Sequence, residues 1–145
     1  MTTTAPSLNG QVLGEAEHAT RALLERVLRT TGITFHQWVI LNGASLGGGS
    51  IARGAAVGRM VQALKIDEPT AQAGVEAVLA EGLATQDGGS LTLTTTGQER
   101  HRQVAGASAA ISQRLYGDLP AEDLATAGRV LSLVTARANA ELAAG

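Results

Sequence analysis

The chain has 145 residues and a mass of 14.8 kDa, and its 44% apolar and 17% charged residues supply enough apolar surface for a packed core. This composition excludes a wholly disordered chain and leaves room for one domain, or for one small domain carried on a helical dimerisation frame. Eleven basic and thirteen acidic residues give a net charge of −2. That charge excludes a general attraction to nucleic acid or anionic lipid, so any basic patch is local.

The sequence also excludes several classes of site and location. It contains no cysteine, which rules out disulfides, thiolate zinc sites, iron–sulfur clusters and cysteine nucleophiles. The first ten residues lack the charged and apolar regions of a signal peptide, and no apolar run approaches the roughly 18 residues of a membrane span. We therefore expect a cytoplasmic protein with no membrane partner.

The first third of the chain predicts two helices. Residues 1–7 are small and polar and predict a disordered start. Apolar residues from position 8 to position 28 recur at helical spacing, and residues 29–32 end that helix. Thr34 is the predicted N-cap of a second helix, which the glycines at 47–49 end.

The middle of the chain predicts two more helices and a β-hairpin. Residues 51–64 show helical spacing, and Asp67 caps a further helix that has Pro69 in its first turn and ends at Gly82. Leucines alternate with a threonine over residues 90–94, which pair with residues 83–86 around a turn at 87–89. This hairpin is the only β-structure that the sequence predicts.

Two long helices, over residues 96–116 and 120–142, complete the chain. The last one carries an apolar stripe too long for a peripheral helix of a small monomer to bury, so a partner chain is its natural cover. The stripe consists of Leu124, Val130, Leu131, Val134, Ala138 and Leu142.

This order of elements predicts a mainly α fold with a small two-stranded β-wing: a winged helix-turn-helix in a helical dimerisation frame. Over residues 8–142 the sequence resembles the MarR family of bacterial transcriptional regulators. The resemblance rests on four segments: TFHQWVIL at 34–41, MVQALKID at 60–67, VEAVLAEGL at 75–83 and LTLTTTG at 91–97.

The resemblance implies a division of the chain and a set of partners. Residues 35–94 would form the winged helix-turn-helix domain, and residues 8–34 and 95–145 the helical dimerisation region. It implies an obligate homodimer that presents two recognition helices to successive major grooves of pseudo-palindromic double-stranded DNA. It also implies a pocket between the two regions for a small aromatic or phenolic ligand.

The sequence departs from the family at the residues that meet DNA. The family commonly has Ser-Thr and then two arginines in the recognition helix, where this chain has Pro69, Thr70, Ala73 and Ala77. The wing has no Arg or Lys over residues 83–94. Residues 51–94 hold three basic and five acidic residues, a net charge of −2, so we expect weak DNA binding with a shallow salt dependence.

Two kinds of DNA contact are predicted. Thr70, Gln72 and Gln62 are candidates for base edges, because glutamine suits adenine and threonine suits the thymine methyl group, with a solvated helix face as the alternative. Basic side chains near the groove are candidates for phosphate contacts, with ordinary surface charge as the alternative. The predicted interface comprises Arg53, Arg59, Gln62, Lys65, Pro69, Thr70, Gln72, Ala73 and Ser90.

A ligand pocket is predicted from the aromatic residues and histidines. Phe35 and Trp38 share a helix face and form either a stacking floor for a planar ligand or part of the core. His18, His36 and His101 come from three helices expected to converge near this pocket. No two histidines have metal-ligand spacing, so we predict no metal and no cofactor.

The sequence shows no catalytic motif. The glycines at 47–49 follow a helix and lack the lysine of a phosphate-binding loop, and no nucleophile elbow is present. We therefore predict a dimeric, ligand-responsive transcriptional regulator rather than an enzyme. The alternative is a protein of this fold that has lost DNA binding and serves as a small-molecule binder, a partner of another regulator or a repurposed catalyst.

Overall fold

The computed structural model describes residues 5–145, so the first four residues of the predicted disordered segment lie outside the described part. The chain forms two compact units, Met1–Ser108 and Ala109–Gly145. The first unit holds five helices or parts of helices and a small sheet, and the second consists of helical segments alone. The mainly helical fold with a small sheet agrees with the sequence prediction.

Helix α1 spans Gly10–Thr31 and begins two residues later than the apolar pattern predicts. The reason is Asn9, whose side-chain oxygen accepts a hydrogen bond of 2.9 Å from the backbone N–H of Val12. Asparagine is among the strongest N-cap residues, so the helix starts directly after it. Gly32, with φ +71°, ends the helix in the left-handed conformation that glycine adopts without strain.

Helix α2 spans Phe35–Leu46 and begins at the predicted N-cap. Gln37 donates its backbone N–H to the Thr34 hydroxyl at 3.1 Å, and its side-chain oxygen accepts the Thr34 N–H at 2.9 Å. This reciprocal pair is a capping box, which satisfies two N–H groups that the first turn leaves unpaired. The helix ends at Gly47, as predicted.

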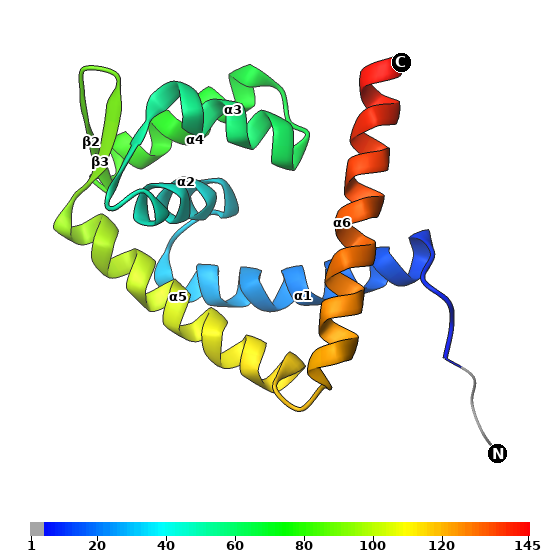
Figure 1. The fold of residues 1–145 in the computed structure, drawn as a ribbon. Coiled ribbons are helices and arrows are strands. Elements are labelled where there is room, and N and C mark those ends of the chain that lie inside the picture. The colour runs from blue at the N-terminus through cyan, green and yellow to red at the C-terminus, as the bar shows by residue number, and fades with distance from the viewer. Residues whose placement is uncertain (1–4) are drawn as a thin grey trace. The chain divides into compact units, whose positions relative to one another are not determined.

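Helices α3 and α4 form the helix-turn-helix. Helix α3 spans Arg53–Leu64, and Lys65 turns the chain with φ +56°. Helix α4 spans Glu68–Ala80 and is capped by Asp67, which accepts the Thr70 N–H at 2.8 Å. Figure 1 shows α3 and α4 next to α2, with the hairpin of the sheet projecting beyond them.

The sheet has three antiparallel strands in the order β1-β3-β2: the predicted two-stranded wing is β2 and β3, and β1 is a third strand that the sequence did not predict. Strand β1 is Ser50–Ala52, β2 is Ala84–Asp87 and β3 is Ser90–Leu93. The predicted helix over 51–64 therefore starts only at residue 53. A three-residue strand is too short for alternation to show, and β1 forms only because the distant β3 supplies its backbone partners.

The wing also differs in register from the prediction. Asp87 belongs to β2 and pairs with Ser90, so the turn contains only two residues, Gly88 and Gly89. Gly88 has φ +60°, a conformation that two-residue hairpin turns require.

The hydrophobic core of the first unit lies between α2, α3, α4 and the sheet, with contributions from α1 and α5. Most of its members are aliphatic, and none is aromatic, as the low aromatic content requires. The buried residues are Leu28, Ile33, Ile40, Leu41, Ala44, Ala56, Val57, Met60, Ala71, Val75, Val78, Leu83, Ala84, Leu91, Leu93 and Val104.

Helix α5, Thr95–Tyr116, begins where the wing ends. Thr94 donates its hydroxyl to the Gly82 carbonyl at 2.6 Å and accepts the Gly97 N–H at 3.1 Å. A Cβ atom at Gly97 would lie 1.9 Å from the Leu83 carbonyl oxygen, so only glycine fits this approach. The start of α5 is therefore fixed against the base of the wing.

Helix α6, Ala121–Ala144, forms most of the second unit and has no buried residue. Within residues 5–145, no helix combines the length and the apolar character that crossing a membrane demands.

Candidate nucleic-acid interface and ligand pocket

The N-terminal half of α4 presents an exposed face opposite its buried face. Ala71 and Val75 are buried in the core at helical spacing, which fixes the rotation of the helix. Pro69, Thr70 and Ala73, all predicted DNA contacts, are exposed as a result. The predicted contacts on this helix thus lie on one accessible surface.

Gln72, on the same helix, is half-buried because it contacts Arg53 at the start of α3. The Gln72 side-chain oxygen accepts hydrogen bonds from Arg53 Nε at 3.1 Å and from Nη2 at 2.8 Å. Arg53 Nη2 also pairs with Glu76 Oε1 at 2.8 Å, and Nη1 donates to Gln86 Oε1 at 2.8 Å. The backbone N–H of Arg53 donates to the Gly89 carbonyl at 2.8 Å.

One arginine therefore connects α3, α4 and the wing. We call Arg53, Gln72, Glu76 and Gln86 the Arg53 network. The sequence predicts Arg53 as a phosphate contact, whereas here its guanidinium is bound by three side chains and only 23% of its side chain is exposed. Glu76 offsets its charge, so the network acts first as a brace between α4 and the wing.

The other predicted phosphate and base contacts lie on or next to α3. Arg59, Gln62 and Lys65 are exposed, and the Arg59 guanidinium lies close to Gly43 of α2. Ser90 is half-buried at the start of β3, where it is paired with a residue of each neighbouring strand. These four positions belong to the same unit as α4.

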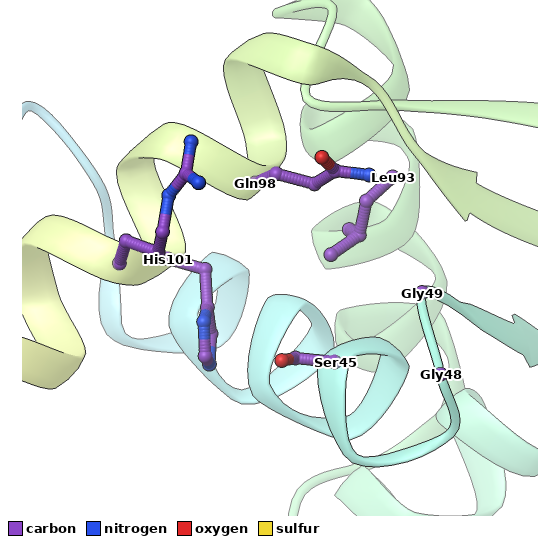
Figure 2. A pocket seen from close by; sticks show the side chains of 7 residues that line it. Ser45, Gly48, Gly49, Leu93, Gln98 and His101 are labelled. Carbon is purple, nitrogen blue, oxygen red and sulfur yellow. The ribbon is translucent and has the colours of Figure 1, made fainter.

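A pocket of about 270 Å³ lies between the C-terminal end of α2, the glycine turn that follows it, and the first turns of α5 (Figure 2). In Figure 2 the His101 ring and the Gln98 side chain extend from α5, with Ser45 on α2 opposite. The lining residues are Ser45, Gly48, Gly49, Leu93, Gln98, His101 and Arg102. A guanidinium, an imidazole, an amide and a hydroxyl beside one leucine suit a small anionic ligand with an apolar part.

His101 is held in place from the α2 side. Its ring stacks on Trp38 at a centroid distance of 5.1 Å and 19° between planes, and Nε2 lies 3.1 Å from Asn42 Oδ1. Burial lowers the pKa of His101 below the ordinary value for histidine, so the ring favours its neutral form. Of the five predicted pocket residues, only His101 lines this pocket, and Trp38 stacks on its ring from the α2 side.

The remaining predicted pocket residues do not line this pocket. Phe35 packs against the core and lies under the Arg21 guanidinium, whose carbon is 3.5 Å from the ring centroid. His36 is next to Phe35, with the ring centroids 6.4 Å apart. His18 has an 85% exposed side chain beside Glu17, so the expected approach of three histidines to the pocket is not seen.

Sequence reasoning did not identify Arg102, Gln98 or the glycine turn as pocket residues. The position of Gln98, three residues before the predicted His101, is a usable signal, since residues three apart lie on the same face of a helix. Nothing in the sequence showed that the start of α5 packs across the end of α2. In the described part of the chain, no three His, Asp or Glu side chains are grouped closely enough to hold a metal ion.

No protein-family model matches the sequence, and no curated protein matches it either. Solved structures do match. CouR from Rhodococcus jostii, bound to p-coumaroyl-CoA, has a TM-score of 0.73 at 14% identity, covering 87% of this chain and 90% of its own. NadR, in complex with 4-hydroxyphenylacetate, has a TM-score of 0.69 at 16% identity, and the match covers 93% of this chain and 98% of the NadR chain. A MarR family transcriptional regulator from Silicibacter pomeroyi has a TM-score of 0.67 at 18% identity, and the match covers 86% of this chain and 88% of that regulator.

The chain has the MarR fold. The structural likeness covers most of the chain, which agrees with the resemblance seen in the sequence over residues 8–142. Within this MarR fold, α3 and α4 form the helix-turn-helix and β2 and β3 form the wing. The chain still differs in charge from the MarR family pattern described for the sequence. No basic residue lies on the exposed face of α4 or in the wing.

Proposed function

We propose that the protein is a cytoplasmic, homodimeric transcriptional regulator of the MarR type that binds double-stranded DNA through α4 and responds to a small ligand. The observation that carries the proposal is the exposed polar start of α4 in a helix-turn-helix braced against a wing. In helix-turn-helix proteins the N-terminal residues of the second helix meet base edges in the major groove. Thr70 and Gln72 are at those positions.

Helix α6 supports the dimer. A 24-residue helix without a buried residue leaves Leu124, Val134 and Leu142 between 37% and 66% exposed. Apolar surface on this scale is typical of an interface. A second copy of the chain is the occupant that we propose, with two recognition helices reading the half-sites of a pseudo-palindromic operator.

The pocket supports the response to a ligand. Arg102 can pair with a carboxylate and Leu93 can contact an apolar ring, so we propose a small aromatic acid. NadR and CouR were solved with a phenolic acid and a phenolic acyl thioester, which are compounds of related chemistry.

The route from pocket to DNA interface is short. Gly48 and Gly49 line the pocket, Gly49 accepts the Leu93 N–H at 2.9 Å, and strand β1 leads from Gly49 directly to Arg53. A ligand that favours one arrangement of this turn would shift the population of recognition-helix positions.

A second function has an observation of its own in its favour. The Arg53 charge is offset by Glu76, and residues 51–94 carry a net charge of −2, which opposes binding to phosphate. A protein of this fold that binds a small molecule without binding DNA would show the same features.

The deciding experiment is fluorescence anisotropy with a labelled duplex from the region upstream of the gene, titrated at several salt concentrations against a scrambled duplex. We expect selective binding that weakens with salt, and loss of selectivity in T70A/Q72A. Q103A, which removes an exposed glutamine from α5, is the matched control and keeps wild-type selectivity.

Equal binding to both duplexes, or none at low salt, would reject the regulator and favour the ligand binder. The ligand is tested separately with 4-hydroxyphenylacetate as the probe, by calorimetry on the wild type and on R102A. We expect binding to the wild type that R102A weakens about tenfold or more, the loss of one charge-assisted contact.

A further inference from the structure

The Arg53 network fixes the orientation of the Gln72 side-chain amide. Both hydrogen bonds between the two residues run from the Arg53 guanidinium to the Gln72 oxygen, at 3.1 Å and 2.8 Å. A guanidinium has only donors, so the amide nitrogen cannot take the place of this oxygen. The chemistry of the contact therefore assigns the amide oxygen to the Arg53 side.

The other partners of Arg53 hold it where it makes this contact. Glu76 pairs with Nη2 at 2.8 Å, and Gln86 of the wing accepts from Nη1 at 2.8 Å. Gln86 is itself oriented, because its amide nitrogen donates to the Gly88 carbonyl at 3.2 Å. With the Arg53 backbone bound to Gly89, the guanidinium is fixed from two elements and from its own main chain.

The consequence for Gln72 concerns what it offers to DNA. Both acceptor positions of its oxygen are taken by Arg53, and the two hydrogens on Nε2 face away from that residue. The usual pairing of glutamine with adenine needs one donor and one acceptor, to reach N7 and the N6 amino group. Gln72 retains only the donors.

We propose that Arg53 is a positioning residue for sequence readout, which makes Gln72 a donor-only reader that selects guanine over adenine. Guanine presents two acceptors in the major groove, N7 and O6, whereas adenine places an amino group next to N7. This inference rests on the proposed DNA-binding function. It replaces the expectation from the sequence that Gln72 suits adenine.

The test is selection of bound duplexes from a pool with randomised half-sites, using the full-length wild type, R53M and Q72E, followed by sequencing. In the wild type we expect guanine at one position of each half-site. R53M frees the Gln72 oxygen, so the ratio of adenine to guanine at that position rises about fivefold or more.

Q72E keeps an acceptor for Arg53 but has no N–H, so guanine is lost and bases with amino groups, cytosine and adenine, are enriched instead. Circular dichroism checks that R53M folds. If R53M does not fold, Q72E still decides the test. Two controls separate readout from charge: Q103E adds the same charge on α5, and E76Q removes the ion pair while leaving both bonds to Gln72. Both retain the guanine preference.

The outcomes distinguish this inference from the proposed function. Selective binding in which the wild type prefers adenine, or in which R53M leaves the guanine preference unchanged, overturns the role of Arg53 and leaves the regulator intact. If none of the five proteins enriches any sequence, the proposed function fails and this inference with it.

Discussion

At the residue scale, Gly97 shows how a single missing side chain connects the wing to the long helix. Its Cα lies so close to the Leu83 carbonyl that a Cβ would be 1.9 Å from that oxygen, and the obstacle is backbone, which cannot rotate away. Gly106, one further glycine of α5, has open space around it. Glycine is therefore required at position 97, whereas at position 106 a larger residue also fits.

We expect G97A to lower the free energy of unfolding by about 1–3 kcal/mol, because the added methyl group overpacks a rigid contact. G106A is the matched control and should raise stability by about 0.5–1 kcal/mol, the gain in helix propensity from glycine to alanine. Urea unfolding followed by circular dichroism measures both. Equal effects of the two substitutions would contradict the close approach at Leu83.

His101 gives a pH dependence whose sign follows from its lowered pKa. A lowered pKa means that His101 binds a proton less tightly in the folded protein than in the unfolded chain. At pH values between the lowered pKa and the ordinary histidine pKa, the unfolded state therefore binds more protons. The stabilisation from neutral His101 is complete above about pH 6.5 and is lost as the pH falls through the lowered pKa.

The check is the change in unfolding free energy between about pH 7.5 and about pH 5.5, compared between wild type and H101Q. We expect a smaller loss in H101Q, because that variant has no ring to protonate. H18Q, which replaces an 85% exposed histidine, should keep the wild-type slope. A steeper loss in H101Q than in the wild type would reverse the assigned sign.

At the element scale, the beginnings and ends of the helices follow from local chemistry. Asn9, Thr34 and Asp67 each accept a backbone N–H three residues ahead, and α1, α2 and α4 begin directly after them. The capping box at Thr34 has an added feature, since the Gln37 side chain that completes it is buried to 1% exposure. The start of α2 is thereby joined to the core.

We expect T34A to cost about 1 kcal/mol of stability, because it removes the hydroxyl that accepts the Gln37 N–H. T30A is the control: Thr30 is an exposed residue of the last turn of α1, and its hydroxyl bonds only within its own helix, to the Val27 carbonyl at 2.7 Å. Thermal unfolding of both variants measures the difference. A cost for T30A as large as for T34A would argue against the capping box.

At the scale of the whole molecule, the proposed homodimer rests on the exposed apolar stripe of α6. Its apolar stripe includes Val134, which is 41% exposed, and Leu142, which is 66% exposed. An isolated chain would present these side chains to water, at a cost that burial in an interface removes.

V134D should convert the proposed homodimer to monomers, because an unpaired carboxylate buried in an interface is strongly unfavourable. S132D introduces the same charge two residues earlier, about 200° around the helix, and should leave the dimer unchanged. Sedimentation velocity at several concentrations distinguishes the two states. A V134D protein that sediments as the wild type does would exclude this stripe from the interface.

Prediction from the sequence succeeded where the cause is local and failed where it is not. The caps and glycine ends predicted the helices to within a few residues, because neighbouring atoms determine them. The pattern predicts a helix from residue 51, whereas residues 51 and 52 belong to β1, because that three-residue strand forms only through pairing with β3. The network around Arg53 joins positions 53, 72, 76 and 86, which no spacing pattern connects.

The sequence by itself determined the helices, the hairpin, the absence of cysteine chemistry and the net charge of −2 over residues 51–94, because composition and short-range contacts are sufficient for these. Only the tertiary structure decided which polar groups meet: Arg53 with Gln72, His101 with Trp38 and Asn42, and the end of α2 with the start of α5. Hydrogen bonds and stacking act over a few ångströms in space and carry no signature along the chain. The orientation of the Gln72 amide, on which the proposed base selection depends, is therefore a property of the fold.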